Sequence, residues 1–156
     1  TDTDGNGKLS IVLNPLFVLS DEEIRKVEED LSGYEVNYAV IADNIAVLKD
    51  ALLYSEYYVC LLSPGIFEDY ASVSGVSVFR PVADFLSREG LELCGECGVY
   101  LRSTRLAAAP GFSDLPEDTV ICLRTKPVIS SAFTKSKNDR YYAAAEDFFR
   151  AVLNAQ

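Results

Sequence analysis

The chain has 156 residues, 49% of them hydrophobic, which predicts one α/β domain over residues 1–156 with a single hydrophobic core. Its 24 acidic and 14 basic side chains give a net charge of −10, which repels phosphate backbones, so nucleic acid is not an expected partner. Because the sequence contains no histidine, Ser-His-Asp and Cys-His catalysis and the HExxH zinc proteases are excluded.

The first stretch, TDTDGNGKLS, resembles the start of a calcium-binding EF-hand loop. Counted from Asp2, it places Asp4, Asn6 and Ser10 at ligand positions, but Leu13 stands where the loop needs a Glu that supplies two oxygens. A strand-like run with a proline follows instead of a helix. We therefore expect residues 1–7 to form a polar lead-in, and calcium binding through this loop is kept as an alternative function.

The next two elements are predicted from a proline and a capping pattern. Residues 8–13 are β-rich, and Pro15 ends this first strand because proline has no N–H to donate. Ser20 and Glu23 have the spacing of a capping box, which predicts a helix over residues 21–31.

The following segments complete an alternating pattern of strands and helices. Residues 34–41 read as a second strand, a second helix is expected from Asp43 to Tyr54, and residues 57–63 form a continuous apolar strand typical of a buried parallel sheet. A β-α-β-α-β order with short connections predicts parallel strands joined by right-handed crossovers.

The rest of the chain is predicted to add a loop, two helices and further strands. The loop covers residues 63–75, a helix covers 80–89, strands lie within 91–102 and 118–124, and a long helix covers 138–155. The fold class predicted from this order is α/β, with a three-layer, mostly parallel central sheet of the flavodoxin-like or Rossmann-like kind.

The four cysteines are interpreted as thiols in a reducing compartment. Cys60 and Cys122 stand in apolar runs, which is typical of buried core residues. Cys94 and Cys97 form C-x-x-C between glycines, a pattern that favours a turn over a redox helix, although a redox or metal role is the alternative. With no signal-peptide pattern and no membrane-length apolar run, we expect a cytoplasmic protein without a membrane partner, metal or cofactor.

Polar side chains follow the carboxyl ends of the three predicted parallel strands. In such a sheet these ends meet at one edge, where ligands bind. The candidate binding residues there are Asn14, Asp43, Asn44, Ser63, Glu68, Asp69 and Ser72. No GxGxxG or GxxxxGK[ST] pattern occurs, so neither a dinucleotide nor a P-loop nucleotide is supported.

Four short segments of the chain, Asn14–Pro15, Asn44–Asp50, Leu61–Pro64 and Asp69–Ser72, carry a resemblance to a known family. In them the chain resembles the nucleoside 2-deoxyribosyltransferase-like family, which has a flavodoxin-like fold and acts on the N-glycosidic bond of deoxynucleosides. The resemblance implies a nucleoside or nucleotide as small-molecule partner, and a homo-oligomer is left open because family members often complete the site from a neighbouring subunit.

The same resemblance assigns roles to individual residues. It implies a catalytic role for Asp69, and together with the predicted edge of the sheet it gives Asn14, Asp43, Asn44, Ser63, Glu68 and Ser72 as substrate-binding residues. In the family pattern D-x-G-x-x-x-E, however, the nucleophilic Glu falls on Gly75 and the Gly on Ala71. The chain therefore resembles a family member without its nucleophile, and whether it is an enzyme is left undecided.

A second resemblance favours a different class of function. The stretch YSEYYVCLLSPGIF, residues 54–67, is similar to the third-strand region of TIR domains, which are interaction modules. The alternative hypothesis is therefore a TIR-like or scaffold domain that binds another protein without catalysis.

Overall fold

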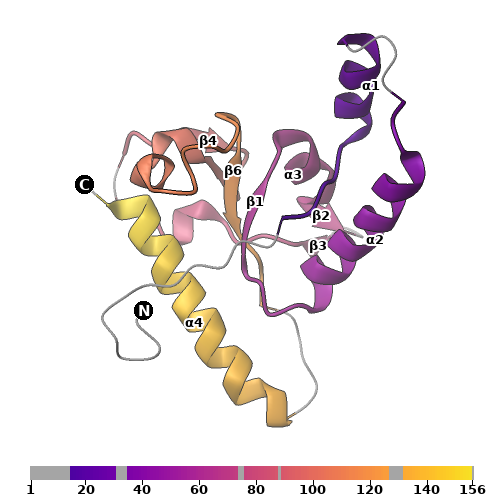
Figure 1. Ribbon diagram of the computed structural model, residues 1–156. Coiled ribbons are helices and arrows are strands. Elements are labelled where there is room, and N and C mark those ends of the chain that lie inside the picture. Colours follow the sequence, from indigo (N-terminus) through magenta and orange to yellow (C-terminus); the bar gives the residue numbers. More distant parts are fainter. Residues whose placement is uncertain (1–14, 31–34, 74–75, 88, 127–131, 156) are drawn as a thin grey trace.

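The computed structural model describes residues 15–30, 35–73, 76–87, 89–126 and 132–155 (Figure 1). Its helices are α1 (Asp21–Asp30), α2 (Tyr38–Tyr54), α3 (Pro64–Tyr70) and α4 (Ala132–Asn154). Its strands are β1 (Val59–Leu62), β2 (Ser72–Val73), β3 (Val76–Ser77), β4 (Leu93–Cys94), β5 (Gly98–Tyr100) and β6 (Val120–Leu123). Short 3₁₀ turns cover Val82–Asp84, Leu101–Ser103 and Arg105–Ala108.

The main sheet has the strand order β1-β6-β5-β4, and each of its neighbouring pairs is antiparallel. The prediction of a mostly parallel, three-layer, flavodoxin-like or Rossmann-like sheet is therefore wrong. β1 pairs with β6, so that Cys60 lies opposite Cys122, and the described residues before β1 contain no strand. The predicted strand over residues 8–13 lies outside the described residues, and the described residues before β1 do not show the predicted β-α-β order.

The predicted strand over residues 34–41 is wrong because the chain enters a helix at Tyr38. The Asn37 side chain accepts a hydrogen bond from the Val40 N–H at 3.2 Å, which is the geometry of a helix N-cap. The buried residues of α2 are Ile41, Leu48 and Leu52. Their spacing follows the helical period of 3.6 instead of the strand period of two. The helix predicted from Asp43 therefore begins five residues earlier.

β6 is the central strand and its four residues are buried. β1 lies along one side of it, and β5 lies along the other. Residues 78–80 continue the β5 side, because the Arg80 N–H donates to the Leu123 carbonyl at 2.8 Å and the Thr125 N–H donates to the Val78 carbonyl at 2.7 Å. Both edges of β6 are therefore paired with neighbouring strands.

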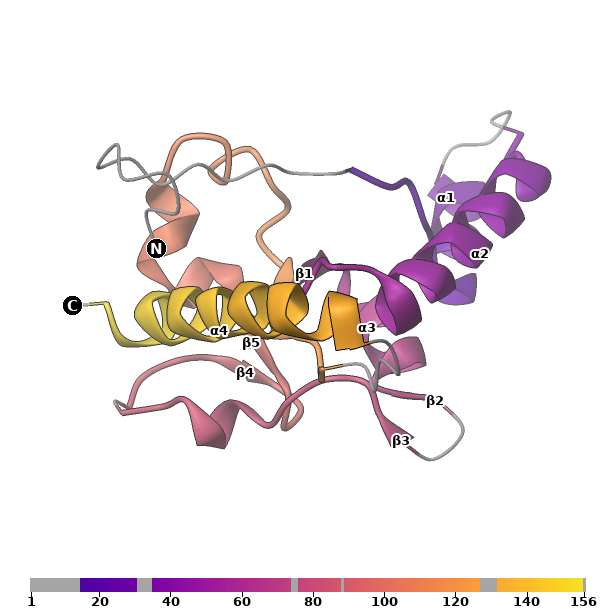
Figure 2. The same cartoon turned by 90° about the horizontal axis from the view of Figure 1, so that it is seen from below.

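Helices cover the two faces of the sheet, as Figures 1 and 2 show. Ile121 and Leu123 point into a core that includes Phe149 and Leu153 of α4. Val120 and Cys122 point the opposite way, into a core formed mainly with residues of α2, α3 and the strand around Phe79. Successive side chains of β6 point to opposite faces of the sheet and therefore pack into two separate hydrophobic clusters.

Two further predictions differ from the structure and one agrees with it. The predicted loop over residues 63–75 contains α3, whose start is marked by Ser63 as N-cap and Pro64 in the first turn. The predicted helix over residues 80–89 is reduced to the 3₁₀ turn Val82–Asp84, since Val82 and Phe85 are drawn into the α4 core. The C-x-x-C segment does form a turn between β4 and β5, with Gly95 at a φ of +58°.

Candidate functional site

The structure does not bring the sequence-predicted site residues together at one edge of a sheet. Asn14 lies outside the described residues, as do Gly75 and the EF-hand-like stretch, and the side chain of Ser72 is not described. Asp43 is exposed on α2 and Glu68 is exposed on α3. Because the strands are antiparallel, their carboxyl ends point in opposite directions and no common rim forms.

Two of the predicted residues have structural roles. The Asn44 side-chain amide donates to the Phe17 carbonyl at 2.7 Å, which ties α2 to the segment before α1. The Ser63 hydroxyl accepts a hydrogen bond from the Ile66 N–H at 3.4 Å and caps α3. These contacts account for both residues without a ligand.

Asp69 is the predicted site residue that lines a cleft. The cleft lies between the start of α1, α2 and α3 and has a volume of about 590 Å³. Apolar and polar side chains line it: Leu19, Ser20, Asp21, Ile45, Lys49, Leu52, Leu53, Ile66, Asp69 and Tyr70. An apolar floor with a few charged groups at its edge is typical of a binding site.

The predicted capping box at the start of α1 is confirmed, and it shapes one wall of the cleft. The Ser20 N–H donates to Glu23 Oε2 at 2.7 Å, and the Glu23 N–H donates to Ser20 Oγ at 3.3 Å. The Ser20 side chain lies directly on Gly65 of α3, where an added Cβ would come to 3.0 Å from Ser20 Cβ and closer still to its Oγ. Since the Glu23 carboxylate occupies the helix start, an anionic ligand there would meet a like charge.

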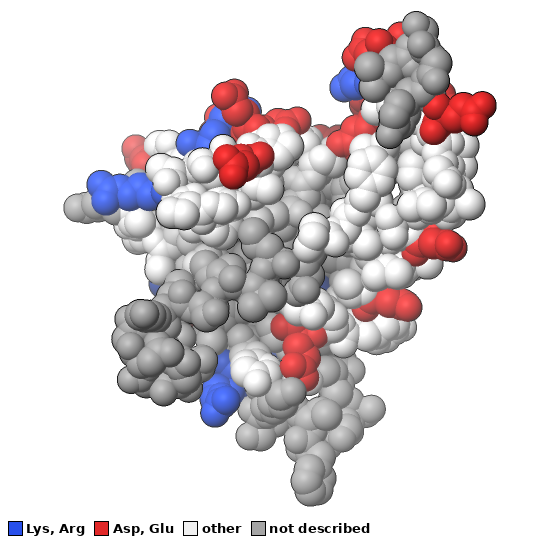
Figure 3. Space-filling model, in the orientation of Figure 1, with Lys and Arg blue, Asp and Glu red and all other residues white. Residues whose placement is uncertain are grey.

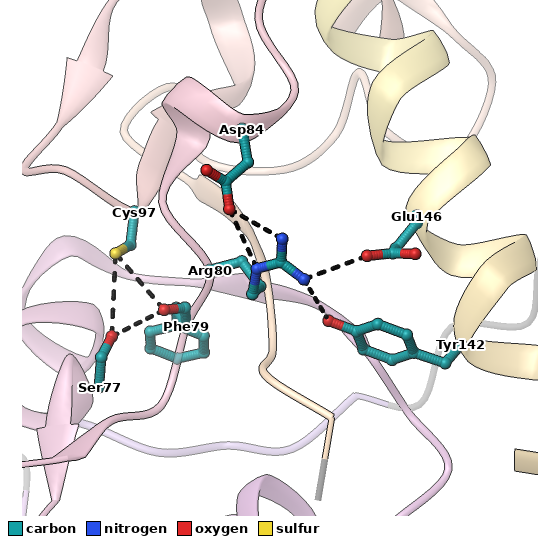
Figure 4. Close-up of polar contacts among 7 residues, drawn as sticks. All are labelled: Ser77, Phe79, Arg80, Asp84, Cys97, Tyr142 and Glu146. Carbon is teal, nitrogen blue, oxygen red and sulfur yellow. Dashed lines mark hydrogen bonds and ion pairs between the residues drawn. The ribbon is translucent and has the colours of Figure 1, made fainter. Parts of the chain in front are cut away.

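A second polar cluster surrounds Arg80, at the end of the sheet near α4 (Figure 4). Its guanidinium contacts Asp84 Oδ2 at 2.8 Å, Glu146 Oε1 at 3.2 Å and the Tyr142 hydroxyl at 3.4 Å. The hydrogen bond to Asp84 raises the pKa of Arg80, and burial raises the pKa of Tyr142. The Arg80 guanidinium thus links the Val82–Asp84 turn to α4.

Cys97 lies beside this cluster but is not arranged as a nucleophile. Its Sγ lies 3.5 Å from the Phe79 carbonyl and 4.0 Å from Ser77 Oγ. Burial raises the pKa of the Cys97 thiol, which keeps it protonated at neutral pH. The α1–α2–α3 cleft and a hollow of about 380 Å³ within residues 101–117 are both lined by other residues, so we assign the Arg80 cluster a structural role.

The outward side of α2 is the feature that the sequence interpretation missed. Of its 17 residues, three are buried. Val40, Val47, Leu53 and Tyr54 are 46%, 54%, 40% and 74% exposed. Figure 3 shows a mostly uncharged surface over this helix, interrupted by acidic side chains. The available signal was the composition of residues 38–54, which contain three charged side chains, too few for a helix with one solvated face.

Charged side chains are distributed unevenly between the two halves of the chain. Residues 15–70 carry 12 acidic and 3 basic side chains, a net charge of −9, whereas residues 71–156 carry ten of each. We call residues 15–70, which include α1, α2 and α3, the acidic arm. The strong negative charge of the whole chain is therefore almost entirely a property of this arm.

The comparisons with known proteins give no relative. No family model matches the chain, and no curated protein or solved structure matches it either. Within the described ranges, no cluster of three or more Cys, Asp or Glu side chains is placed to hold a metal ion. None of the helices in the described part of the chain is long and apolar enough to cross a membrane.

Proposed function

We propose that this chain is a non-catalytic protein-interaction module and that the exposed side of α2 forms its contact surface. The observation that carries the proposal is the exposure of apolar side chains along α2, from Val40 through Val47 to Tyr54. A helix that is apolar around most of its circumference is normally buried, so apolar side chains that are exposed on such a helix indicate an interaction site. The fold itself leaves this surface uncovered by the residues that the structure describes.

The nucleoside-related function stays a prediction that no observation tests. Asp69 does line a cleft, but the rim that was to place it beside Asn44 and Ser63 is not formed. We keep the cytoplasm as the proposed compartment, because four free thiols, two of them buried and two partly buried, suit a reducing environment.

A photo-crosslinking experiment tests the contact surface. The full chain carries a benzoylphenylalanine at position 47, and a matched control carries it at position 93 on β4, since Leu93 is 47% exposed against 54% for Val47. We expect a defined protein adduct in cell extract at position 47 only. The captured protein is then purified, and we expect Val47→Glu to weaken its binding by roughly tenfold or more, whereas Leu93→Glu leaves it unchanged.

Two outcomes would overturn the proposal. One is equal capture at positions 47 and 93, or binding that Val47→Glu leaves unchanged. The other is release of free base from deoxynucleosides or their monophosphates that is lost in Asp69→Ala. Because these side chains are exposed, circular dichroism and the urea midpoint verify that each variant is folded.

A further inference from the structure

The acidic side chains of the arm differ from those elsewhere in having few basic partners. After residue 71, Asp84 and Glu146 pair with Arg80, Glu92 pairs with Arg102, and Asp139 pairs with Lys126. In the arm, Glu22 pairs with Lys26. Asp43, Asp50 and Asp69, in contrast, make no ion pair with any described residue.

From this difference we infer that the acidic arm binds a basic amphipathic helix of another protein, seated with its apolar face in the α1–α2–α3 cleft. The inference rests on the proposed function and adds the chemistry of the partner. Like charges concentrated in one arm repel one another, and a positively charged partner relieves that repulsion while steering its own approach. Charge complementarity therefore selects the class of partner, and the apolar cleft anchors it.

The shape of the cleft suits one face of a helix. Ile45, Leu52 and Ile66 contribute apolar side chains between three helices, and the cleft volume of about 590 Å³ accommodates several apolar side chains of a partner. An amphipathic helix presents such side chains at i, i+3, i+4 and i+7. Its basic residues would then lie over the rim, where Asp21 and Asp69 line the cleft.

The same charges disfavour the other occupants of this surface. An anionic membrane or a nucleic acid would meet like charge across the whole arm. A second copy of the chain would bring a second arm with a net charge of −9 against the first. Lys49 is the one basic side chain that lines the cleft, and it makes no ion pair with a described residue. Its positive charge therefore repels a basic partner. Reversing that charge should strengthen binding, whereas reversing the acidic residues should weaken it.

The test uses two designed helical peptides labelled with fluorescein. Both have leucines on one face, and their other faces carry either lysines or glutamates. We expect the lysine peptide to bind the full chain and the glutamate peptide to bind at least roughly tenfold more weakly. The affinity for the lysine peptide should fall with added salt, because the screening length shrinks to about 8 Å at physiological ionic strength.

Charge-reversed variants locate the contact. Asp50→Lys combined with Asp69→Lys should weaken the lysine peptide roughly tenfold, and Lys49→Glu should tighten it. The matched control combines Glu89→Lys with Asp114→Lys, exposed positions outside the arm that change the net charge by the same amount. Leu53→Glu should also weaken binding, whereas Leu93→Glu should not.

Several results would overturn the inference and leave the proposed function standing. These are equal binding of the two peptides, no binding of either, an equal effect of the two double variants, and co-sedimentation with phosphatidylserine vesicles. A dimer in sedimentation equilibrium that Leu53→Glu dissociates would identify a second copy as the occupant of the cleft instead. The crosslinking result at position 47 depends on none of these charges, so the two proposals fail separately.

Discussion

The helices on the two faces of the β6 sheet differ in how much of their apolar surface the fold uses. On one face, α4 buries Phe149 and Leu153 completely. On the other, α2 buries three of its 17 residues and leaves Val47 about half exposed. The composition of the two helices follows this difference, since residues 132–154 contain seven charged side chains and residues 38–54 contain three. The difference teaches that α4 completes the core, whereas α2 carries more apolar surface than this fold needs.

The arm is nevertheless joined firmly to the sheet through Arg124. This arginine is 1% exposed, and its Nη1 donates to the Ala51 carbonyl at 2.6 Å, while Nη2 donates to the Ser55 carbonyl. Its guanidinium also lies 5.1 Å from the centre of the Tyr58 ring. A buried cation thus satisfies carbonyls at the end of α2, where the helix dipole is negative. Arg124 thus anchors the C-terminal end of α2 to the sheet, while the outward side of this helix stays exposed.

The largest expected effect is the loss of the α4 core. Phe149→Ala removes a fully buried ring that meets Phe85 edge to face, and it should lower the free energy of unfolding by about 3–5 kcal/mol. Urea titration followed by circular dichroism measures the change. The paired variant Val47→Ala on α2 should stay within about 0.5 kcal/mol. A large cost for Val47→Ala would show that α2 is packed after all and would remove the contrast between the faces.

The second expected effect concerns the joint between arm and sheet. Arg124→Ala leaves the carbonyls of Ala51 and Ser55 without their charged donor, which should cost about 2–4 kcal/mol. Hydrogen exchange should quicken most at the Ser55 amide, which bonds to Ala51 at 3.3 Å, and less in α4. Arg105→Ala, at an exposed position, is the control. Uniform loss of protection over both helices would mean that Arg124 supports the whole core and is not specifically a joint.

Local signals in the sequence were enough to predict the elements that lie at the centre of this contrast. The capping box of α1 and the apolar run of β1 are found where the sequence places them, and the terminal helix is found as well, but it begins at Ala132, six residues before its predicted start at residue 138. Residues 34–41 were assigned wrongly because Tyr, Val and Ile favour strands, while the side-chain cap from Asn37 decides for a helix. Strand direction was also wrong, since the pairing of Cys60 with Cys122 joins residues far apart in sequence and no local pattern specifies it.

The candidate site shows the same limit. Asp69 was predicted as a site residue from a rim of parallel strands, and it does line a cleft, but that cleft is built from three helices. Ile45 and Lys49 belong to it because α2 packs beside α1 and α3, which is a consequence of tertiary structure alone. The charge asymmetry of the arm, in contrast, was readable from the sequence once residues 15–70 were counted separately from the rest.

A third, smaller effect is expected where α1 meets α3. Gly65→Ala places a methyl group against the Ser20 side chain, and the displacement of α1 should cost about 1–3 kcal/mol. Ser20→Gly removes the obstructing atoms and by itself should cost a few tenths of a kcal/mol, about the effect of replacing an N-cap by glycine. The double variant should therefore be more stable than the sum of the two single effects. Strict additivity would show that Gly65 is not needed for close approach.

The smallest expected effect is a difference between the α4 face and α2 in how strongly a tyrosine substitution changes stability at alkaline pH. Burial raises the pKa of Tyr142 above its ordinary value of 10.0, so the folded state keeps the phenol proton at pH values where the unfolded chain has lost it. Tyr142 thus contributes stability that is fully present below pH 10.0 and is lost as pH rises from there through the folded-state pKa. Urea midpoints measured from neutral to alkaline pH should fall less steeply in Tyr142→Phe than in the native chain. Tyr54→Phe, on the exposed side of α2, is the matched control, and a slope that changes equally in both variants would contradict the assignment of Tyr142 to a tightly packed face.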